Sequence, residues 1–200
     1  MTCERGMNGS ERRTGLCLTC GLCCDGTLFG SVELQPGDDP AHLQALGLRI
    51  LRGRAKATQT SLATTKPPSA KLKFLQPCVA LEASGRCAIY HERPTYCRGF
   101  DCALLKAVAA DRLTTPAARR KIKNALKQVA LVRRLLRRLG QTDEGRDLRS
   151  RVRRLGITLQ HRTLSEAEAA LYGRLTLAIH SLDRRLRRDF LPDPSASHSD

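Results

Sequence analysis

Residues 17–26 read CLTCGLCCDG, and the four cysteines in this stretch decide how the chain has to fold. A C-x2-C turn places two sulfurs on one side of a tight loop, where both can bind the same cation. Cys23 and Cys24 are adjacent, and neighbouring side chains diverge in most backbone conformations. Either one of these two cysteines is a spare, or the two belong to two different metal sites.

A second block of four cysteines follows between residues 78 and 102. Fifty-three residues separate Cys24 from Cys78, so a metal shared by both blocks would close a long loop and add its binding energy to folding. Neither block alone forms a well-shaped site, and we therefore expect both to converge. The predicted metal ligands are Cys17, Cys20, Cys23, Cys24, Cys78, Cys87, Cys97 and Cys102. The ninth cysteine, Cys3, is isolated and is not expected to be a ligand.

The spacing leaves the metal open between zinc and iron. Zinc takes four thiolates in a tetrahedron, commonly from C-x2-4-C pairs. Cys17, Cys20 and Cys23 also match the first three ligands of the bacterial ferredoxin run, but its fourth ligand would fall on Thr27. An iron–sulfur cluster would thus need a thiolate from the second block. Eight thiolates allow either one two-metal site or two separate four-thiolate sites.

The surroundings of the cysteines favour metal ligands over disulfides. Met1 to Arg13 contain no apolar signal segment, and no stretch approaches the roughly 18–20 apolar residues of a membrane-spanning helix. We therefore expect a cytoplasmic protein, in which thiols stay reduced and clustered cysteines bind metals. A single cysteine is often a small buried hydrophobic residue, but eight in two short blocks are poorly explained in that way.

The two blocks together resemble the YkgJ-type CxxCxxCC cysteine-cluster proteins. The resemblance rests on CLTCGLCCDG, on PCVAL at residues 77–81 and on GRCAIYHERPTYCRGFDC at residues 85–102, in that order. It covers about half of the chain, and all eight cysteines have counterparts. The resemblance implies a bacterial protein with a zinc- or iron-chelating domain, and it implies nothing secure about the other half.

Charged residues beside the ligands fit the RPxxCR-like stretch of the same family. Arg93, Arg98 and Asp101 are candidates for supporting the ligands, because guanidinium groups and backbone amides can donate hydrogen bonds to thiolate sulfurs. Alternatively, the two arginines only pair with Asp101 or Glu92, and the sequence favours neither role. His91 could replace a cysteine as a ligand, although a histidine of this kind is more often a surface residue.

The second half of the chain is strongly basic. Residues 104–190 hold 22 Lys and Arg against 8 Asp and Glu, which accounts for 14 of the net charge of +16. Nucleic acid or an acidic protein surface could bind such a region. We favour instead a solvated outer face of helices, because Tyr172 and Phe190 are its only aromatics and no known DNA- or RNA-reading motif occurs. Without Trp and with little Phe, the region is not expected to bind a membrane.

The predicted fold class is α+β, with a small cysteine-rich, metal-bound half that has short strands and packs on, or is followed by, a helical, hairpin-like basic half. The predicted divisions are a disordered leader (1–15), a metal-binding domain (16–103), a basic helical region (104–191) and a disordered tail (192–200). Local patterns predict strands at 27–34 and 87–90, a short helix at 41–51 and a polar loop at 52–71.

Two long amphipathic helices are predicted in the basic half, at about residues 117–139 and 164–190. Apolar residues recur there every three or four positions, which marks one buried face on each helix. The second helix is expected to begin with a capping box over residues 163–166. We expect the two helices to pack antiparallel and to bury Leu126, Leu136, Leu175 and Leu182.

No catalytic residue can be assigned from the sequence. It contains no Ser/His/Asp set, no HExxH motif, no phosphate-binding Gly loop and no catalytic carboxylate pair. Three classes of function remain: a metal-binding module without catalysis, an iron–sulfur redox or transferase enzyme, and a zinc-structured nucleic-acid-binding protein. The first is favoured.

Overall fold

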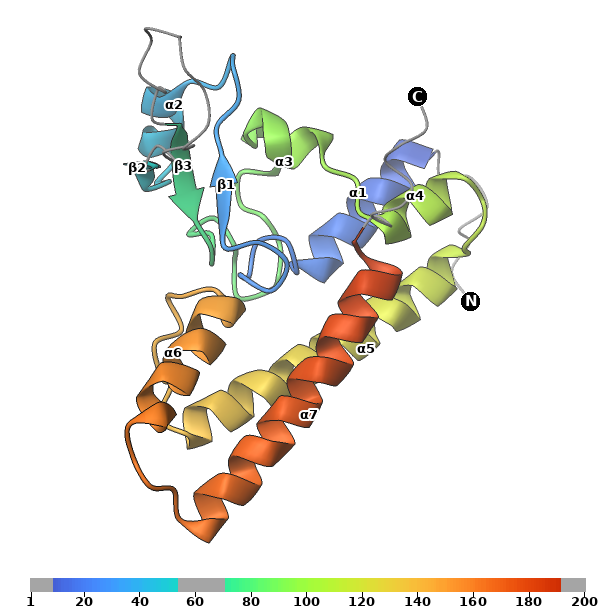
Figure 1. Ribbon diagram of the computed structural model, residues 1–200. Helices are drawn as coiled ribbons and strands as arrows, with labels where there is room; N and C mark the ends of the chain where they lie inside the picture. Colours follow the sequence, from blue (N-terminus) through green and yellow to red (C-terminus); the bar gives the residue numbers. More distant parts are fainter. Residues whose placement is uncertain (1–8, 54–70, 192–200) are drawn as a thin grey trace, which may run out of the picture.

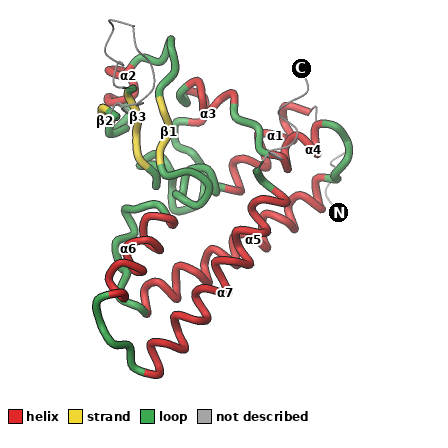
Figure 2. Tube along the Cα trace, viewed as in Figure 1, coloured by secondary structure: helices red, strands yellow, loops and turns green. Residues whose placement is uncertain are grey.

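The computed structural model describes residues 9–53 and 71–191, and its elements confirm the α+β class. Helices dominate, and three short strands form one small sheet (Figures 1 and 2). The helices are α1 (Gly9–Cys20), α2 (Pro40–Ala45), α3 (Thr95–Gly99), α4 (Ala103–Ala109), α5 (Thr115–Arg138), α6 (Leu148–Gln160) and α7 (Glu166–Asp189). The strands are β1 (Ser31–Glu33), β2 (Ile50–Arg52) and β3 (Leu72–Leu75).

The strands pair antiparallel in the order β1-β3-β2. In the central strand β3, Phe74 lies opposite Val32 of β1 and Ile50 of β2. Phe74 and Val32 are buried together with Leu43 of α2 and with Leu48. This small apolar core holds α2 against the sheet, and both lie at the upper left of Figure 1.

α5 and α7 form the long axis of the other half. They pack antiparallel, as the periodicity of their apolar residues predicts, and α6 lies beside the C-terminal part of α5 (Figure 1). Of the side chains expected in the contact, Leu136, Leu175 and Leu182 are buried. Leu126 is the exception, because it lies at the edge of the buried face and is only half-buried.

One continuous apolar core joins the cysteine-bearing residues to the long helices. Leu16 of α1 and the following Leu22 belong to the same buried cluster as Val132 and Leu136 of α5 and Leu175 of α7. Both α1 and α4 contact α5. The cysteines carried by α1 are therefore anchored directly on the helical half.

The strand expected at 27–34 is wrong over its first half. The backbone N–H of Thr27 donates to Asp25 Oδ1 at 2.8 Å, and that of Leu28 donates to the Leu22 carbonyl at 3.0 Å. These two bonds fold residues 27–28 into the turn of the first cysteine block, so that strand pairing starts only at Ser31.

Two other short elements also differ from expectation. The helix expected at 41–51 ends at Ala45, because Gly47 turns the chain with a φ of +89° and residues 50–52 join the sheet. No strand forms at 87–90, where Cys87 makes a single bridge to Leu81 and a 3-10 turn begins at Tyr90.

The first residues of α1 and α7 also differ from those expected from the sequence. α1 already begins at Gly9, within the leader expected to be disordered, whereas residues 1–8, 54–70 and 192–200 lie outside the described residues. The capping box of α7 is made by Ser165 and Glu168 rather than by residues 163–166. No helix in the described parts of the chain is long and apolar enough to span a membrane.

Candidate metal centre

The first cysteine block is a helix end followed by a tight turn. Cys17 and Cys20 stand on the last turn of α1, and Gly21, with a φ of +66°, stops the helix. The backbone N–H groups of Cys24 and Asp25 both donate to the Gly21 carbonyl, at 2.8 and 2.9 Å. Cys23 and Cys24 therefore project from a compact turn.

The second block approaches this turn from several segments, and Cys87 lies at the bridge to Leu81 described above. The backbone N–H of Cys78 donates to the Cys24 carbonyl at 2.7 Å, which ties the two blocks directly together. Cys97 belongs to α3, and Cys102 directly precedes α4 as its N-cap residue. The next residue, Ala103, donates its backbone N–H to the Phe190 carbonyl at 3.0 Å, so the end of α7 also holds this segment.

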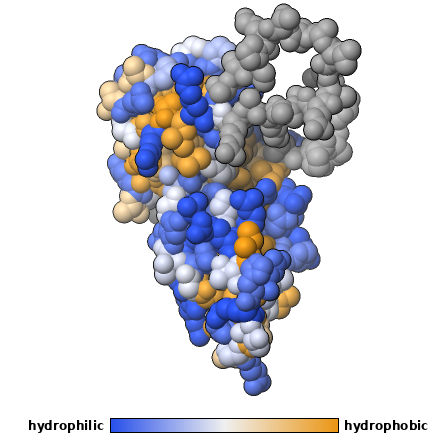
Figure 3. Space-filling view, turned by 60° about the vertical axis from the view of Figure 1, so that its left-hand side comes forward, coloured by the Kyte–Doolittle hydropathy of each residue, from blue (hydrophilic) through white to orange (hydrophobic). Residues whose placement is uncertain are grey.

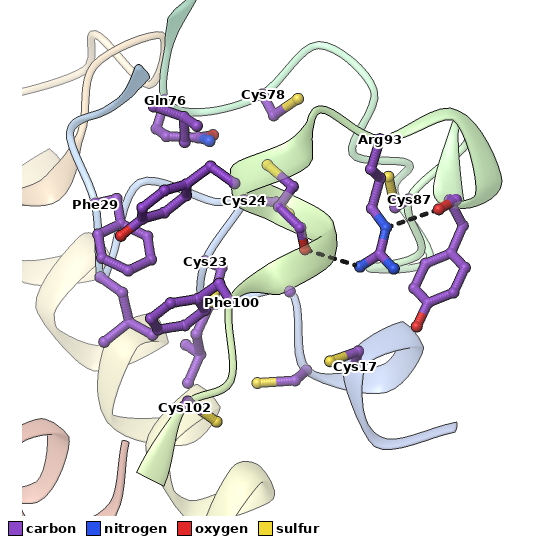
Figure 4. Close-up of a pocket in the computed structure, with 18 of the residues that line it drawn as sticks. Cys17, Cys23, Cys24, Phe29, Gln76, Cys78, Cys87, Arg93, Phe100 and Cys102 are labelled. Carbon is purple, nitrogen blue, oxygen red and sulfur yellow. Dashed lines mark hydrogen bonds between the residues drawn. The ribbon is translucent and has the colours of Figure 1, made fainter. Parts of the chain in front are cut away.

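All eight predicted ligands line one cavity of about 100 Å³ (Figure 4). Its other walls are mainly apolar, and among the described residues no Asp, Glu or His lines it. Within the described parts of the chain, thiols are the only strong metal-binding groups that line this cavity. Thiolate ligands suit zinc and iron–sulfur clusters, so the donor set fits both metals that the sequence leaves open.

The charges that act on the thiols place the eight cysteines in two sets. The pKa of Cys20 is raised to about 12, chiefly by burial and in addition by negative charge on Cys102 and Cys17. Cys97 also has a pKa raised to about 12, by burial first and then by charge on Cys78 and Cys87. The first set comprises Cys17, Cys20, Cys23 and Cys102, and the second comprises Cys24, Cys78, Cys87 and Cys97.

The adjacent pair Cys23 and Cys24 connects the two sets. Burial is the largest influence on both and raises the pKa of each thiol. Negative charge on other cysteines raises both pKa values as well. For Cys23 this charge is on Cys20, Cys24, Cys102 and Cys17, and for Cys24 it is on Cys78, Cys87 and Cys97. In Figure 4, Cys17 and Cys102 lie at the lower end of the cavity and Cys78 lies at the upper end.

Backbone amides near the sulfurs counteract the effect of burial. Burial raises the pKa of Cys78, Cys87 and Cys102, while amide groups two or three residues further along lower it. These amides belong to Ala80, Ile89, Leu104 and Leu105, and Leu22 has the same effect on Cys20. Such donors stabilise a thiolate when a metal replaces its proton.

In the described residues, the positions of the eight sulfurs match neither disulfides nor a closed site for a single metal ion. No disulfide joins any of the eight cysteines that the structure describes. Within residues 9–53 and 71–191, no three Cys, His, Asp or Glu side chains are placed so that they could hold a metal ion directly. Metal binding therefore requires an adjustment of the side chains or a group larger than one ion.

The three charged residues predicted to support the ligands occupy different positions. Arg93 donates from Nε to the Tyr90 carbonyl at 2.7 Å and from Nη1 to the Cys97 carbonyl at 3.3 Å. Its charge lowers the pKa of Cys97 and Cys87, against the larger effect of burial. Arg98 instead donates to Thr95 Oγ1 at 3.3 Å.

Asp101 lies beside Cys102. Burial raises the pKa of Cys102, and the negative charge of Asp101 raises it further. Asp101 thus acts on the thiol in the direction opposite to that of Arg93 on Cys97. His91, the alternative ligand, packs edge-to-face on Tyr90 and does not line the cavity.

Sequence reasoning missed the ion pair that supports the first turn. Arg133 of α5 contacts Asp25 Oδ2 at 3.1 Å and donates to the Asp25 carbonyl at 2.8 Å. It also missed the aromatic group of Phe29, Tyr96 and Phe100, which forms one wall of the cavity. Both depend on contacts between residues far apart in the sequence, and no local spacing signals them.

Comparison with known proteins supports the chemistry of this donor set. A family model described as "CxxCxxCC: putative zinc- or iron-chelating domain" matches residues 16–115, which include all eight clustered cysteines and extend to the start of α5. No curated protein and no solved structure gives a match. With half of its length matched and its eight thiols gathered around one cavity, the chain belongs to the CxxCxxCC family.

Proposed function

We propose that the protein binds metal in two separate four-thiolate centres. The first centre would be held by Cys17, Cys20, Cys23 and Cys102, and the second by Cys24, Cys78, Cys87 and Cys97. The observation that carries this proposal is that the eight thiols line one cavity, with Cys17 and Cys102 at one end and Cys78 at the other. The charges acting on the thiols fall into two sets in the same way, and Cys23 and Cys24 connect these sets. Adjacent side chains that diverge to different centres also account for the otherwise unusual CC pair.

Each centre would cross-link segments that are far apart in the sequence. The first would join the end of α1 to the start of α4, and the second would join the Cys24 turn to the loops that carry Cys78 and Cys87 and to α3. A bound zinc ion supplies a fixed tetrahedral cross-link, and an iron–sulfur cluster additionally supplies electron transfer. Arg93 and the backbone amides would offset the surplus negative charge of the thiolates.

Iron–sulfur binding is the second candidate, and the cavity is large enough for it. A water molecule needs about 10–15 Å³ of such space. The cavity offers about 100 Å³ among eight sulfurs that do not converge on single-ion positions. This room suits polynuclear groups, and a redox or electron-transfer role would follow from them.

Metal analysis of anaerobically purified protein tests both candidates. We expect about two equivalents of zinc without visible absorption, or iron with acid-labile sulfide and broad visible absorption. Cys20→Ser and Cys97→Ser should each remove about half of the metal, and Cys3→Ser is the matched control that should retain all of it. A protein without bound metal would refute the function, and complete loss in either single variant would refute two separate centres.

A further inference from the structure

Five cationic side chains form a line along the solvent side of α5. They are Arg120, Lys123, Lys127, Arg134 and Arg138, and all five are exposed. At about 100° per residue they fall within about 60° of the helix circumference, and at about 1.5 Å per residue they extend over about 27 Å. This line, here called the α5 stripe, faces away from the buried residues Ile122, Val129 and Leu136.

The charges of the α5 stripe are uncompensated. α5 contains no Asp or Glu, and in the described parts of the chain no acidic side chain lies within ion-pair distance of any stripe residue. Other cations of the same helix do have acidic partners. Lys121 pairs with Asp189, Arg133 with Asp25 and Arg137 with Glu144.

The ion pairs of α5 show that part of the positive charge of the basic half is neutralised within the protein. Arg133 and Arg137 contribute to the positive charge of the basic half, yet both form ion pairs with acidic side chains of the same chain. Apart from Arg119, the remaining cations of α5 are aligned on one face instead of being spread around a solvated helix. Figure 3 shows that the tapered lower part of the molecule, formed by the long helices, is mainly hydrophilic.

We propose that the α5 stripe binds the phosphate backbone of duplex nucleic acid. A straight row of Lys and Arg complements a regular row of phosphates and gains affinity through counterion release. α5 has no aromatic side chain on which unpaired bases could stack, which disfavours a single strand. None of the exposed large apolar side chains in the described residues belongs to α5, so the anchors of a protein or membrane interface are missing.

Binding to the phosphate backbone does not depend on the base sequence of the nucleic acid. It is also independent of the proposal that the cysteines bind metal. The stripe residues lie on the face of α5 opposite the core that contacts α1. The full metal-loaded chain is therefore the proper material for the test. Fluorescence anisotropy with a mixed-sequence 20-base-pair DNA duplex, repeated at increasing salt, measures both the affinity and the number of phosphate contacts.

The log–log slope of affinity against salt should be about −4 to −5, for about five contacts at −0.9 each. The double variant Lys127→Glu/Arg134→Glu should weaken binding at least about tenfold at 0.1 M salt and reduce the slope by about two. The control Arg153→Glu/Arg154→Glu makes the same change in net charge on exposed residues of α6 and should change affinity less than about threefold. Unchanged thermal unfolding would show that both variants are folded.

Three results would overturn the proposal. The first is no binding of the duplex at low salt, and the second is an equal loss of affinity in the two double variants, which would indicate net charge alone. The third is tighter binding of poly-L-glutamate than of the duplex at the same salt, which would point to an acidic protein partner.

Discussion

Gly26 is the residue at which the first cysteine block meets α6. Its φ is +78°, a Cβ there would lie 2.9 Å from the Cα of Asp147, and its carbonyl accepts from the Leu148 N–H at 2.9 Å. Gly26→Ala should therefore combine backbone strain with a clash against backbone, lowering stability by about 2–4 kcal/mol. Thermal unfolding measures this loss.

Gly37→Ala is the matched control for Gly26. Gly37 also has a positive φ, +94°, but nothing lies within 4 Å of a Cβ at that position. This variant should show only the strain of the left-handed conformation, about 1–2 kcal/mol. Equal destabilisation by the two substitutions would contradict the close contact between the cysteine turn and α6.

Asp189 is a buried carboxylate at the end of α7, and its side chain is 1% exposed. Burial alone would raise its pKa, but hydrogen bonds from Arg188 and Lys121 outweigh burial and leave the pKa lowered. Asp189→Asn should cost about 1.5–3 kcal/mol at neutral pH, the range for hydrogen bonds to charged groups. Asp183→Asn, which breaks the exposed pair with Arg187, should cost clearly less.

The same carboxylate gives a pH dependence with a defined sign. Because the pKa of Asp189 is lower in the folded chain, its contribution is fully present above the unfolded pKa of about 3.9. The contribution is lost as the pH falls through the lower folded value. Denaturant unfolding should thus show a constant difference between wild type and Asp189→Asn from neutral pH to about pH 5, and a shrinking difference below pH 4. A difference that grows on acidification would contradict this sign.

Among the elements, α5 determines how the two halves are joined. Leu136 is 0% exposed in the core that reaches α1, whereas Leu126 of the same helix is half-buried. Leu136→Ala should cost about 2–5 kcal/mol and Leu126→Ala distinctly less, because a smaller part of its side chain leaves the core. Chemical denaturation measures both, and the reverse order would refute the described burial.

The elements also show where sequence reasoning succeeds and fails. The long helices follow from apolar periodicity, because their packing is set by residues three and four apart. The short strands do not, because Thr27 and Leu28 are drawn into the cysteine turn by bonds to Asp25 and Leu22. A local sequence pattern cannot show that these hydrogen bonds prevail over strand pairing.

The candidate metal centre, too, can be predicted from the sequence only in part. Spacing alone singles out the eight cysteines that line the cavity, and it leaves open whether Cys23 and Cys24 serve two metal sites or one of them is a spare. It cannot reveal that Cys102 joins the first block, because that grouping depends on the position of α4, whose first residue Ala103 donates to the carbonyl of Phe190 just after α7.

For the whole molecule, removal of metal should affect more than residues 17–102. α1 carries two of the proposed ligands and shares its core with α5 and α7, so loss of the first centre loosens one wall of that core. A strong chelator should therefore lower the midpoint of thermal unfolding while circular dichroism still shows helix from α5 and α7. Limited proteolysis should cut first within residues 17–102. Unchanged stability and protease resistance after complete metal removal would contradict a structural role.

The central claim, two centres that divide at the CC pair, is tested most directly by metal counting in double variants. After exposure to a competing chelator, native mass spectrometry would compare Cys24→Ser/Cys97→Ser with Cys20→Ser/Cys24→Ser. The first pair lies within one proposed centre and should retain about half of the metal of the wild type, whereas the second removes a ligand from each centre and should retain almost none. Equal metal content in the two double variants would contradict two separate centres.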